Sequence, residues 1–145
     1  MRKFKKNGGF TLVEMLIVVA IIAILVAVSI PIINSALEKA RDATDQANER
    51  AAKAEAAIIV LGAGDLGTTG GSVTLTELES GAFYDAKNGI LKNASKGIEV
   101  YGRCTGTGKC TNDYGKAGKD HTTMIIKITY ASATGYTIEW EAPAT

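Results

Sequence analysis

The chain has 145 residues, 46% of them hydrophobic, with a formal net charge of +1 and a single histidine. This length leaves room for one modest domain, and the nearly balanced charge gives no reason to expect nucleic acid as a partner. With one histidine, no paired catalytic carboxylates and no nucleophile motif, the sequence argues against an enzyme, and we expect no cofactor and no metal.

Basic residues gather at the N-terminus. Arg2, Lys3, Lys5 and Lys6 lie within the first nine residues, which contain no acidic residue, so the rest of the chain is net acidic. A basic patch directly before an apolar segment keeps that end of a membrane protein in the cytoplasm. We therefore expect the chain from Pro31 onward to face outward from the cytoplasmic membrane.

A long apolar segment follows the basic patch. Residues 15–28 are fourteen consecutive apolar residues, and the wider window 10–33 is interrupted only by Thr11, Glu14, Ser29 and Pro31. As a helix this window would measure about 36 Å, enough to cross a bilayer core of roughly 30 Å. A domain of this size cannot bury such a helix on all sides, so the segment must lie in lipid or against copies of itself.

Three common kinds of N-terminal segment explain only part of this pattern. A secretory signal peptide cleaved near residues 26–29 would account for the basic start and the apolar core. An uncleaved single-span anchor would account for the length, and a double-glycine leader would be cut at Gly8 and Gly9. None of the three accounts for two glycines followed by an apolar segment that contains a glutamate, Glu14, just inside its edge.

The stretch KKNGGFTLVEMLIVV resembles the class III signal peptide of type IV pilins and the related pseudopilins. The resemblance covers about residues 5–33 and includes the proline at Pro31. It implies that a membrane-embedded prepilin peptidase cuts after Gly9, so that residues 1–9 are a leader. It also implies that the same enzyme methylates the new N-terminal amine of Phe10, and that the hydrophobic helix, residues 10–33, stays attached to the mature chain.

The new amine gives a reason for Glu14. An α-amine is largely cationic at neutral pH, and a carboxylate four residues along can neutralise it, either in its own chain or in a neighbour. Among packed apolar helices an unpaired charge is very costly, whereas a paired charge is tolerated. Pairing between Glu14 and the Phe10 amine of an adjacent subunit would therefore fix the axial register, a role that the resemblance also implies. The alternative is that Glu14 rests at the level of the lipid headgroups.

Residues 34–62 are predicted to continue the helix in amphipathic form. Alanine, glutamate and lysine favour a helix, Gly62 ends it, and Pro31 is expected to bend it or open it locally. An apolar stripe at three- and four-residue steps is expected to pack on the rest of the domain, and it consists of Leu37, Ala40, Thr44, Ala47, Ala51, Ala54 and Ile58. The other sides are assigned to charged residues, which include Glu38, Asp42, Asp45, Glu49 and Lys53.

The remaining segment, residues 63–145, is predicted to be a globular head. The sequence TLTE from Thr74 to Glu77 has the pattern of a capping box, here before a short helical turn that ends at Gly81. Alternating apolar residues predict strands at 98–101, 123–130 and 136–140. The last two of these strands are expected to form a hairpin.

The expected fold class is therefore α+β. A long N-terminal helix, first hydrophobic and then amphipathic, would pack on a small antiparallel sheet, and this arrangement resembles the pilin fold. Tyr130 and Trp140 are expected in the core or on the sheet, and His121 is expected in a solvated loop.

A glycine motif near the end of the helix resembles a nucleotide-binding loop. Gly62, Gly64 and Gly67 match G-x-G-x-x-G after an apolar run. A dinucleotide-binding fold would need a helix over the residues that follow, but Gly70 and Gly71 lie there and no room remains for a further βαβ unit. We therefore interpret this segment as a connection between the helix and the head.

Cys104 and Cys110 are the only cysteines, and they lie in the glycine-rich stretch CTGTGKC. Because the head is expected outside the cell, a disulfide between them is the natural prediction, with free thiols as the alternative. A two-cysteine metal site would need more ligands than the single histidine supplies. The stretch lies between predicted strands rather than around the C-terminal segment, which differs from many Gram-negative pilins.

These features predict the precursor of a type IV pilus subunit. It would enter the cytoplasmic membrane as a single-pass precursor, be cut by prepilin peptidase, and be polymerised by the pilus assembly machinery. The product would be a helical homo-oligomeric filament on the cell surface that supports adhesion, aggregation or twitching motility. The alternatives are a pseudopilin of a type II secretion or DNA-uptake system and a minor tip pilin that acts as a binding module.

Overall fold

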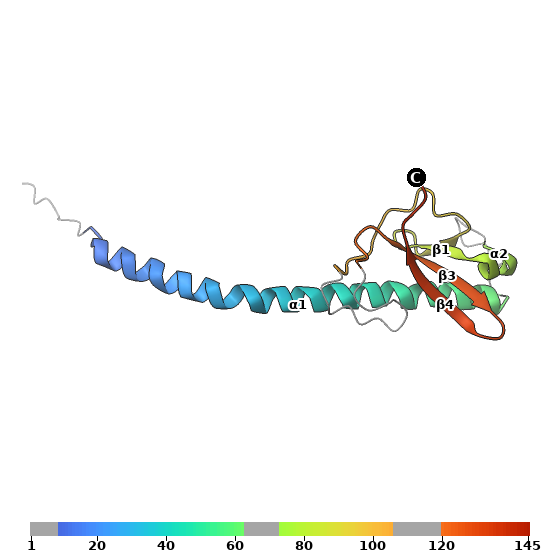
Figure 1. Ribbon diagram of the computed structural model, residues 1–145, viewed down its shortest axis with the longest axis horizontal. Helices are drawn as coiled ribbons and strands as arrows, with labels where there is room; N and C mark the ends of the chain where they lie inside the picture. Colours follow the sequence, from blue (N-terminus) through green and yellow to red (C-terminus); the bar gives the residue numbers. More distant parts are fainter. Residues whose placement is uncertain (1–8, 63–72, 106–119) are drawn as a thin grey trace, which may run out of the picture. The chain divides into compact units, whose positions relative to one another are not determined.

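The computed structural model describes residues 9–62, 73–105 and 120–145 of the chain. These residues form one long helix, one short helix and a four-stranded sheet (Figure 1). They divide into two compact units, one that ends at Ala36 and one that begins at Leu37. Among its described residues, the first unit contains the helix from Leu12 and the three residues before it, and the second contains the rest of the helix, α2 and the whole sheet. The predicted α+β class is confirmed.

The long helix, α1, extends from Leu12 to Val60. Its helical assignment continues through Pro31 without a break, and the bend expected at that residue stays a prediction. The helix ends at the glycine that the sequence indicated. Gly62 has a φ of +76°, a conformation that favours glycine, and its N–H donates to the carbonyl of Ile59 at 3.1 Å.

The short helix, α2, extends from Leu75 to Ser80 and begins with the predicted capping box. The Glu77 N–H donates to the Thr74 hydroxyl at 3.3 Å, and the Thr74 N–H donates to the Glu77 carboxylate at 2.8 Å. The helix ends at Gly81, whose φ of +110° is rarely accessible to other residues.

The sheet contains four antiparallel strands in the order β2-β1-β3-β4. Their bounds are Ala82–Asp85 for β1, Ile90–Lys92 for β2, Ile125–Ala131 for β3 and Gly135–Glu141 for β4. The predicted hairpin is confirmed, because β3 and β4 pair from Ile125 opposite Glu141 to Ala131 opposite Gly135.

The predicted strand at residues 98–101 is wrong, and β1 and β2 were missed. The segment 98–101 has no strand assignment, although Ile98 is buried. Tyr101 contributes its side chain instead: its hydroxyl donates to the Tyr84 carbonyl at 2.9 Å and accepts from the Ile126 N–H at 2.8 Å. This segment therefore contacts the sheet through the Tyr101 side chain, and its backbone does not join the ladder.

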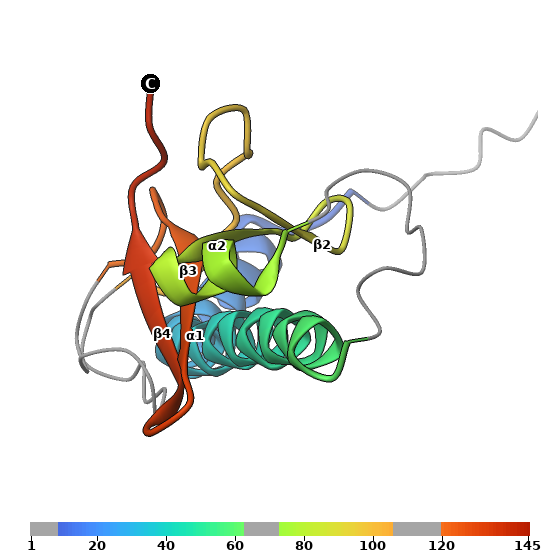
Figure 2. The same cartoon turned by 90° about the vertical axis from the view of Figure 1, so that its right-hand side faces the viewer.

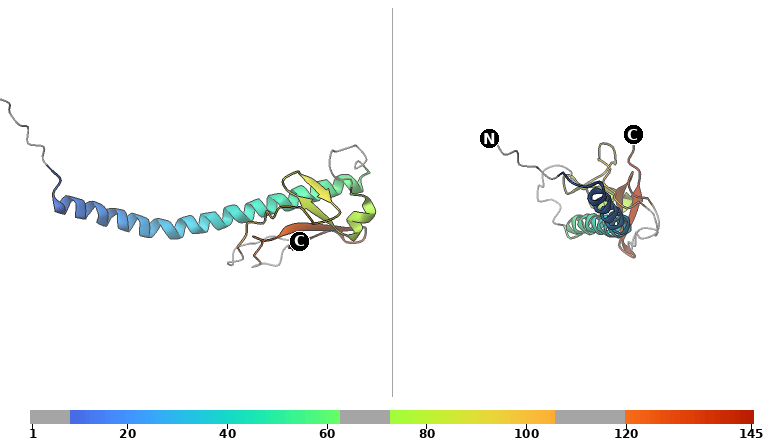
Figure 3. Two further views of the ribbon diagram at one scale, coloured as in Figure 1. Left: turned by 90° about the horizontal axis from the view of Figure 1, so that it is seen from above. Right: turned by 90° about the vertical axis from the view of Figure 1, so that its left-hand side faces the viewer.

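One face of α1 after Leu37 packs on the sheet and on α2 (Figure 2; Figure 3, left). Ala52 and Ala56 are fully buried and belong to the same core cluster as Leu78 of α2 and Ile128 of β3. Trp140 of β4 is also in this core, and Tyr130 packs against it, as the sequence predicted.

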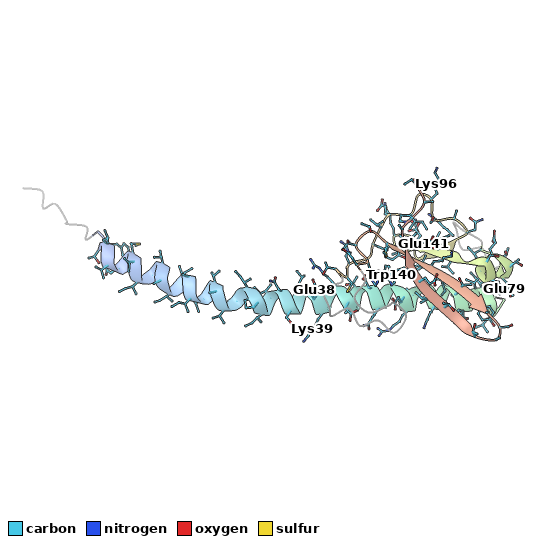
Figure 4. All side chains as sticks on the ribbon, in the orientation of Figure 1. Glu38, Lys39, Glu79, Lys96, Trp140 and Glu141 are labelled. Carbon is cyan, nitrogen blue, oxygen red and sulfur yellow. The ribbon has the colours of Figure 1, made fainter. Side chains whose placement is uncertain are left out.

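The apolar stripe predicted to pack on the head is wrong except at Ala51, which is partly buried against the core cluster. Leu37 and Ile58 are 45% and 42% exposed, and Ala47 at the middle of the stripe is exposed as well. The buried residues of α1 are instead Asp45, Glu49, Ala52 and Ala56. Figure 4 labels Glu38, which is partly buried, and the next residue, Lys39, which is exposed. Periodicity finds an apolar face, but it does not reveal whether the chain's own head covers that face.

Candidate processing and assembly site

The peptide bond expected to be cut lies just before the helix. Gly9 and Phe10 have no regular secondary structure, and the helical residues begin at Leu12. Phe10 is 80% exposed, and apart from Gly9 and its two chain neighbours no atom lies within 4 Å of the position where a Cβ on Gly9 would stand. Among the described residues, nothing therefore packs on Gly9, and a peptidase substrate must be accessible in this way.

Glu14 is held at the start of the helix by Thr11. The backbone N–H and the hydroxyl of Thr11 both donate to Oε2 of Glu14 at 2.8 Å. In return, the N–H of Glu14 donates to the Thr11 hydroxyl at 3.2 Å. This reciprocal pattern is a capping box, which satisfies two of the N–H groups that lack partners at a helix start.

The helix that follows is apolar on every side. All side chains from residue 9 to residue 34 are exposed in the single chain, and Glu14 is the one charged residue between Phe10 and Leu37. By length and composition α1 is able to cross a membrane, since its most apolar 18-residue window has a mean hydropathy of 3.3. The segment therefore needs lipid or other protein around it.

A second polar cluster joins α1 to the head inside the core. Asp45 accepts hydrogen bonds from the N–H groups of Arg103 and Cys104 at 2.8 and 2.9 Å, and its Oδ2 lies 3.1 Å from Nδ1 of His121. Asp45 is fully buried. A buried carboxylate is stable only when its oxygens have partners, and here the head supplies them.

His121 is not the solvated loop residue that the sequence suggested. It is 1% exposed, and its ring stacks on Trp140 with the ring centroids 4.4 Å apart and the planes within 9°. Gly102 makes this packing possible, because a Cβ at that position would come within 1.9 Å of the His121 carbonyl oxygen. No local pattern in the sequence indicates this contact, because it depends on residues distant along the chain.

Glu49 lies one helical turn after Asp45 and accepts a hydrogen bond from the Trp140 indole N–H at 2.8 Å. Burial raises the pKa of Glu49 above its ordinary value, and the neighbouring Asp45 raises it further, whereas the hydrogen bond from Trp140 lowers it. The core therefore favours the protonated form of this acid more than water does. The cluster joins the helix to the head through hydrogen bonds from Arg103, Cys104 and Trp140.

The other predicted sites fall partly outside the described residues. Cys104 is fully buried, but Cys110 is not described, and the disulfide stays a prediction. Gly64 and Gly67 of the glycine motif also lie outside the described residues, whereas Gly62 forms the helix end. Among the residues that the structure describes, no group of three or more histidine, cysteine or acidic side chains is placed to hold a metal.

Residues 4–30 match the family model of the prokaryotic N-terminal methylation motif. The match identifies these residues as a type IV prepilin signal, and it includes Gly9, Phe10 and Glu14. It supports the class of type IV pilins and pseudopilins, whose members are structural proteins. No curated protein and no solved structure matched the chain.

Thr11 is the residue of this site that the sequence reasoning missed. The pattern that predicted the capping box in the head, TLTE, has a close counterpart in TLVE from Thr11 to Glu14. The sequence interpretation assigns Glu14 to an amine or to the lipid headgroups, and it does not locate the start of the helix.

Proposed function

We propose that the protein is a type IV pilin, cut after Gly9 and polymerised through its N-terminal helix into a surface filament. The observation that carries this proposal is a prepilin signal at residues 4–30 whose helical part, from Leu12 onward, leaves every apolar side chain exposed. The protein would act as a structural subunit rather than as an enzyme, and the filament would support adhesion, aggregation or twitching motility.

The exposed apolar helix supports retention of this segment after processing. Before assembly, lipid surrounds residues 12–33, and the basic leader stays on the cytoplasmic side. Once the subunit leaves the bilayer, the same side chains need a new apolar environment, because each large aliphatic side chain costs about 1.5–3 kcal/mol when it is left in water. Copies of the same helix supply that environment in a filament.

Glu14 supports a defined register in the filament. In a bundle of apolar helices its carboxylate is a costly charge unless it meets a cation. The α-amine of Phe10, which prepilin peptidase would create and methylate, is the nearest group of that kind. Pairing with the amine of an adjacent subunit would favour one axial position over all others, so Glu14 would select the register.

Fibres sheared from the surface of cells that make the protein test this proposal. The major protein of long released fibres is expected to be this chain. If the chain is found only in short structures that stay within the cell envelope, it is a pseudopilin, and if it is a rare component of fibres built from another protein, it is a minor pilin. Glu14→Val should leave membrane insertion intact and prevent fibre formation.

A further inference from the structure

Glu14 already accepts hydrogen bonds within its own chain, although the proposed filament pairs the same acid with an amine from another copy. The Thr11 backbone N–H and hydroxyl both reach it at 2.8 Å. An acid fully engaged in capping its helix would have nothing left for a second partner. The two roles are compatible only if they use different oxygen atoms.

The geometry separates the two carboxylate oxygens. Both hydrogen bonds from Thr11 end on Oε2 of Glu14, and Oε1 accepts none from the described part of the chain. A carboxylate has about four lone-pair sites shared by its two oxygens, so Oε1 can still accept a charged donor. Phe10 lies before the cap and outside the helix, so the helix does not need its amine.

We infer that Glu14 divides its two oxygens between two partners. Oε2 caps the helix of its own chain through Thr11, and Oε1 receives the N-terminal amine of a second copy of the chain. Thr11 is then a positioning residue, because its two hydrogen bonds fix the carboxylate before the amine arrives. A glutamate that is already ordered loses less side-chain entropy on pairing than a freely rotating one. This inference rests on the proposed filament.

The cap is tested in the unassembled chain by amide hydrogen exchange, resolved to single residues, with the full-length protein in detergent micelles. The amide of residue 14 reports the hydrogen bond to the Thr11 hydroxyl. Thr11→Val is expected to speed its exchange about five-fold, whereas Thr11→Ser should leave it close to the unchanged chain. Glu14→Gln should also keep the protection, because glutamine completes a capping box as well as glutamate does.

The second partner is tested by the filament yield of the same variants. Thr11→Ser is expected to assemble normally, and Thr11→Val to lose several-fold in yield because the carboxylate is no longer fixed. Glu14→Gln keeps the cap but cannot neutralise an amine, so it should form no filaments. Thr74→Val is the matched control, since it removes the equivalent box in the head, where the corresponding hydrogen bonds measure 2.8, 3.0 and 3.3 Å. It should speed exchange at Glu77 and leave the filament yield unchanged.

The outcomes distinguish the parts of the inference. Unchanged exchange in Thr11→Val would show that there is no cap and would overturn it. Faster exchange with a full filament yield would overturn the positioning role of Thr11 and leave the filament intact. Normal filaments from Glu14→Gln would overturn the amine pairing. If the unchanged chain forms no filament at all, the proposed function fails, and the pairing of Glu14 with the amine of a second copy fails with it. Amide hydrogen exchange at residue 14 still decides whether Thr11 caps the helix.

Discussion

At the scale of single residues, each of the two polar clusters contains an acid in apolar surroundings that accepts specific hydrogen bonds. Asp45 is an acid in the core that receives two backbone N–H groups and lies against His121. Glu14 is an acid in an apolar helix that receives two donors from Thr11. In both cases the charge has specific partners, because an acid without them would destabilise its surroundings. Each acid therefore specifies one arrangement: Asp45 that of the head, and Glu14 that of the helix start.

Asp45→Ala is expected to destabilise the head by about 3–5 kcal/mol, because it leaves the N–H groups of Arg103 and Cys104 and the His121 ring without their acceptor. Urea unfolding of the full chain in detergent micelles, followed by the fluorescence of Trp140, measures this change. Lys39→Ala, on the exposed side of the same helix, is the control and should stay within about 0.5 kcal/mol of the unchanged chain. If Asp45→Ala also changed the free energy of unfolding by less than about 0.5 kcal/mol, the cluster would not stabilise the head as stated.

Glu49 makes the stability of the head depend on pH. Its pKa in the folded chain is raised above the ordinary value of 4.5, chiefly by burial. A raised pKa means that the folded chain binds the proton more tightly than the unfolded chain, so this contribution is full at low pH and is lost as the pH rises through the folded pKa.

Glu49→Gln should remove that contribution to the pH dependence. Glutamine keeps the oxygen that accepts from Trp140 and carries no charge, so the variant should be more stable than the unchanged chain at pH 8. The free energy of unfolding, measured from pH 4 to pH 8, should also fall less steeply in the variant. An equally steep fall in both chains would show that Glu49 is not the group responsible.

At the scale of elements, α1 after Leu37 places two acids, Asp45 and Glu49, inward and most of its regular apolar stripe outward. The two acids share the buried face with Ala52 and Ala56, and the stripe from Leu37 to Ile58 is exposed except at Ala51. The sequence predicted the opposite, because charged residues are almost never fully buried without partners, and those partners lie more than 50 residues away along the chain.

Two matched alanine substitutions test which face is covered. Ala52→Glu places a charge at a fully buried position and should unfold the head or destabilise it by more than about 3 kcal/mol. Ala47→Glu introduces the same charge on the exposed stripe and should change the free energy of unfolding by less than about 0.5 kcal/mol. If Ala47→Glu destabilised the head more than Ala52→Glu, the predicted apolar stripe would be the face that packs on the head.

The elements that could be predicted are those whose pattern is local. The hairpin of β3 and β4 has clear alternation and a turn between its strands, and the α2 capping box lies within four residues. β1 and β2 contain four and three residues, too few to show a period, and they are defined by pairing with each other and with β3. The burial of His121 depends on Asp45, Gly102 and Trp140, which no local pattern connects.

At the scale of the whole molecule, the chain divides its tasks along its length. In the proposed pilin, the leader and the Gly9–Phe10 bond would serve processing, the apolar half of α1 would serve membrane insertion and assembly, and the part after Leu37 forms the head. Gly9, Phe10 and Glu14 could be predicted as site residues from the sequence, because they lie close together in one continuous motif. Thr11 was the exception, since its role depends on where the helix begins.

Gly9→Val tests the first of these tasks. A β-branched side chain before the scissile bond should trap the uncut precursor in the membrane, because the peptidase is expected to need a glycine there. Immunoblotting of membrane fractions would separate the precursor from the mature chain by the mass of nine residues. Normal processing of this variant would contradict the cleavage site.

The most direct test of the account is intact-mass and N-terminal mass spectrometry of the protein recovered outside the cell. We predict a chain that begins at Phe10, carries one methyl group on its α-amine, and retains the whole of α1. A chain that begins near Ile30, without the apolar helix, would show an ordinary secretory signal peptide and would contradict assembly through that helix.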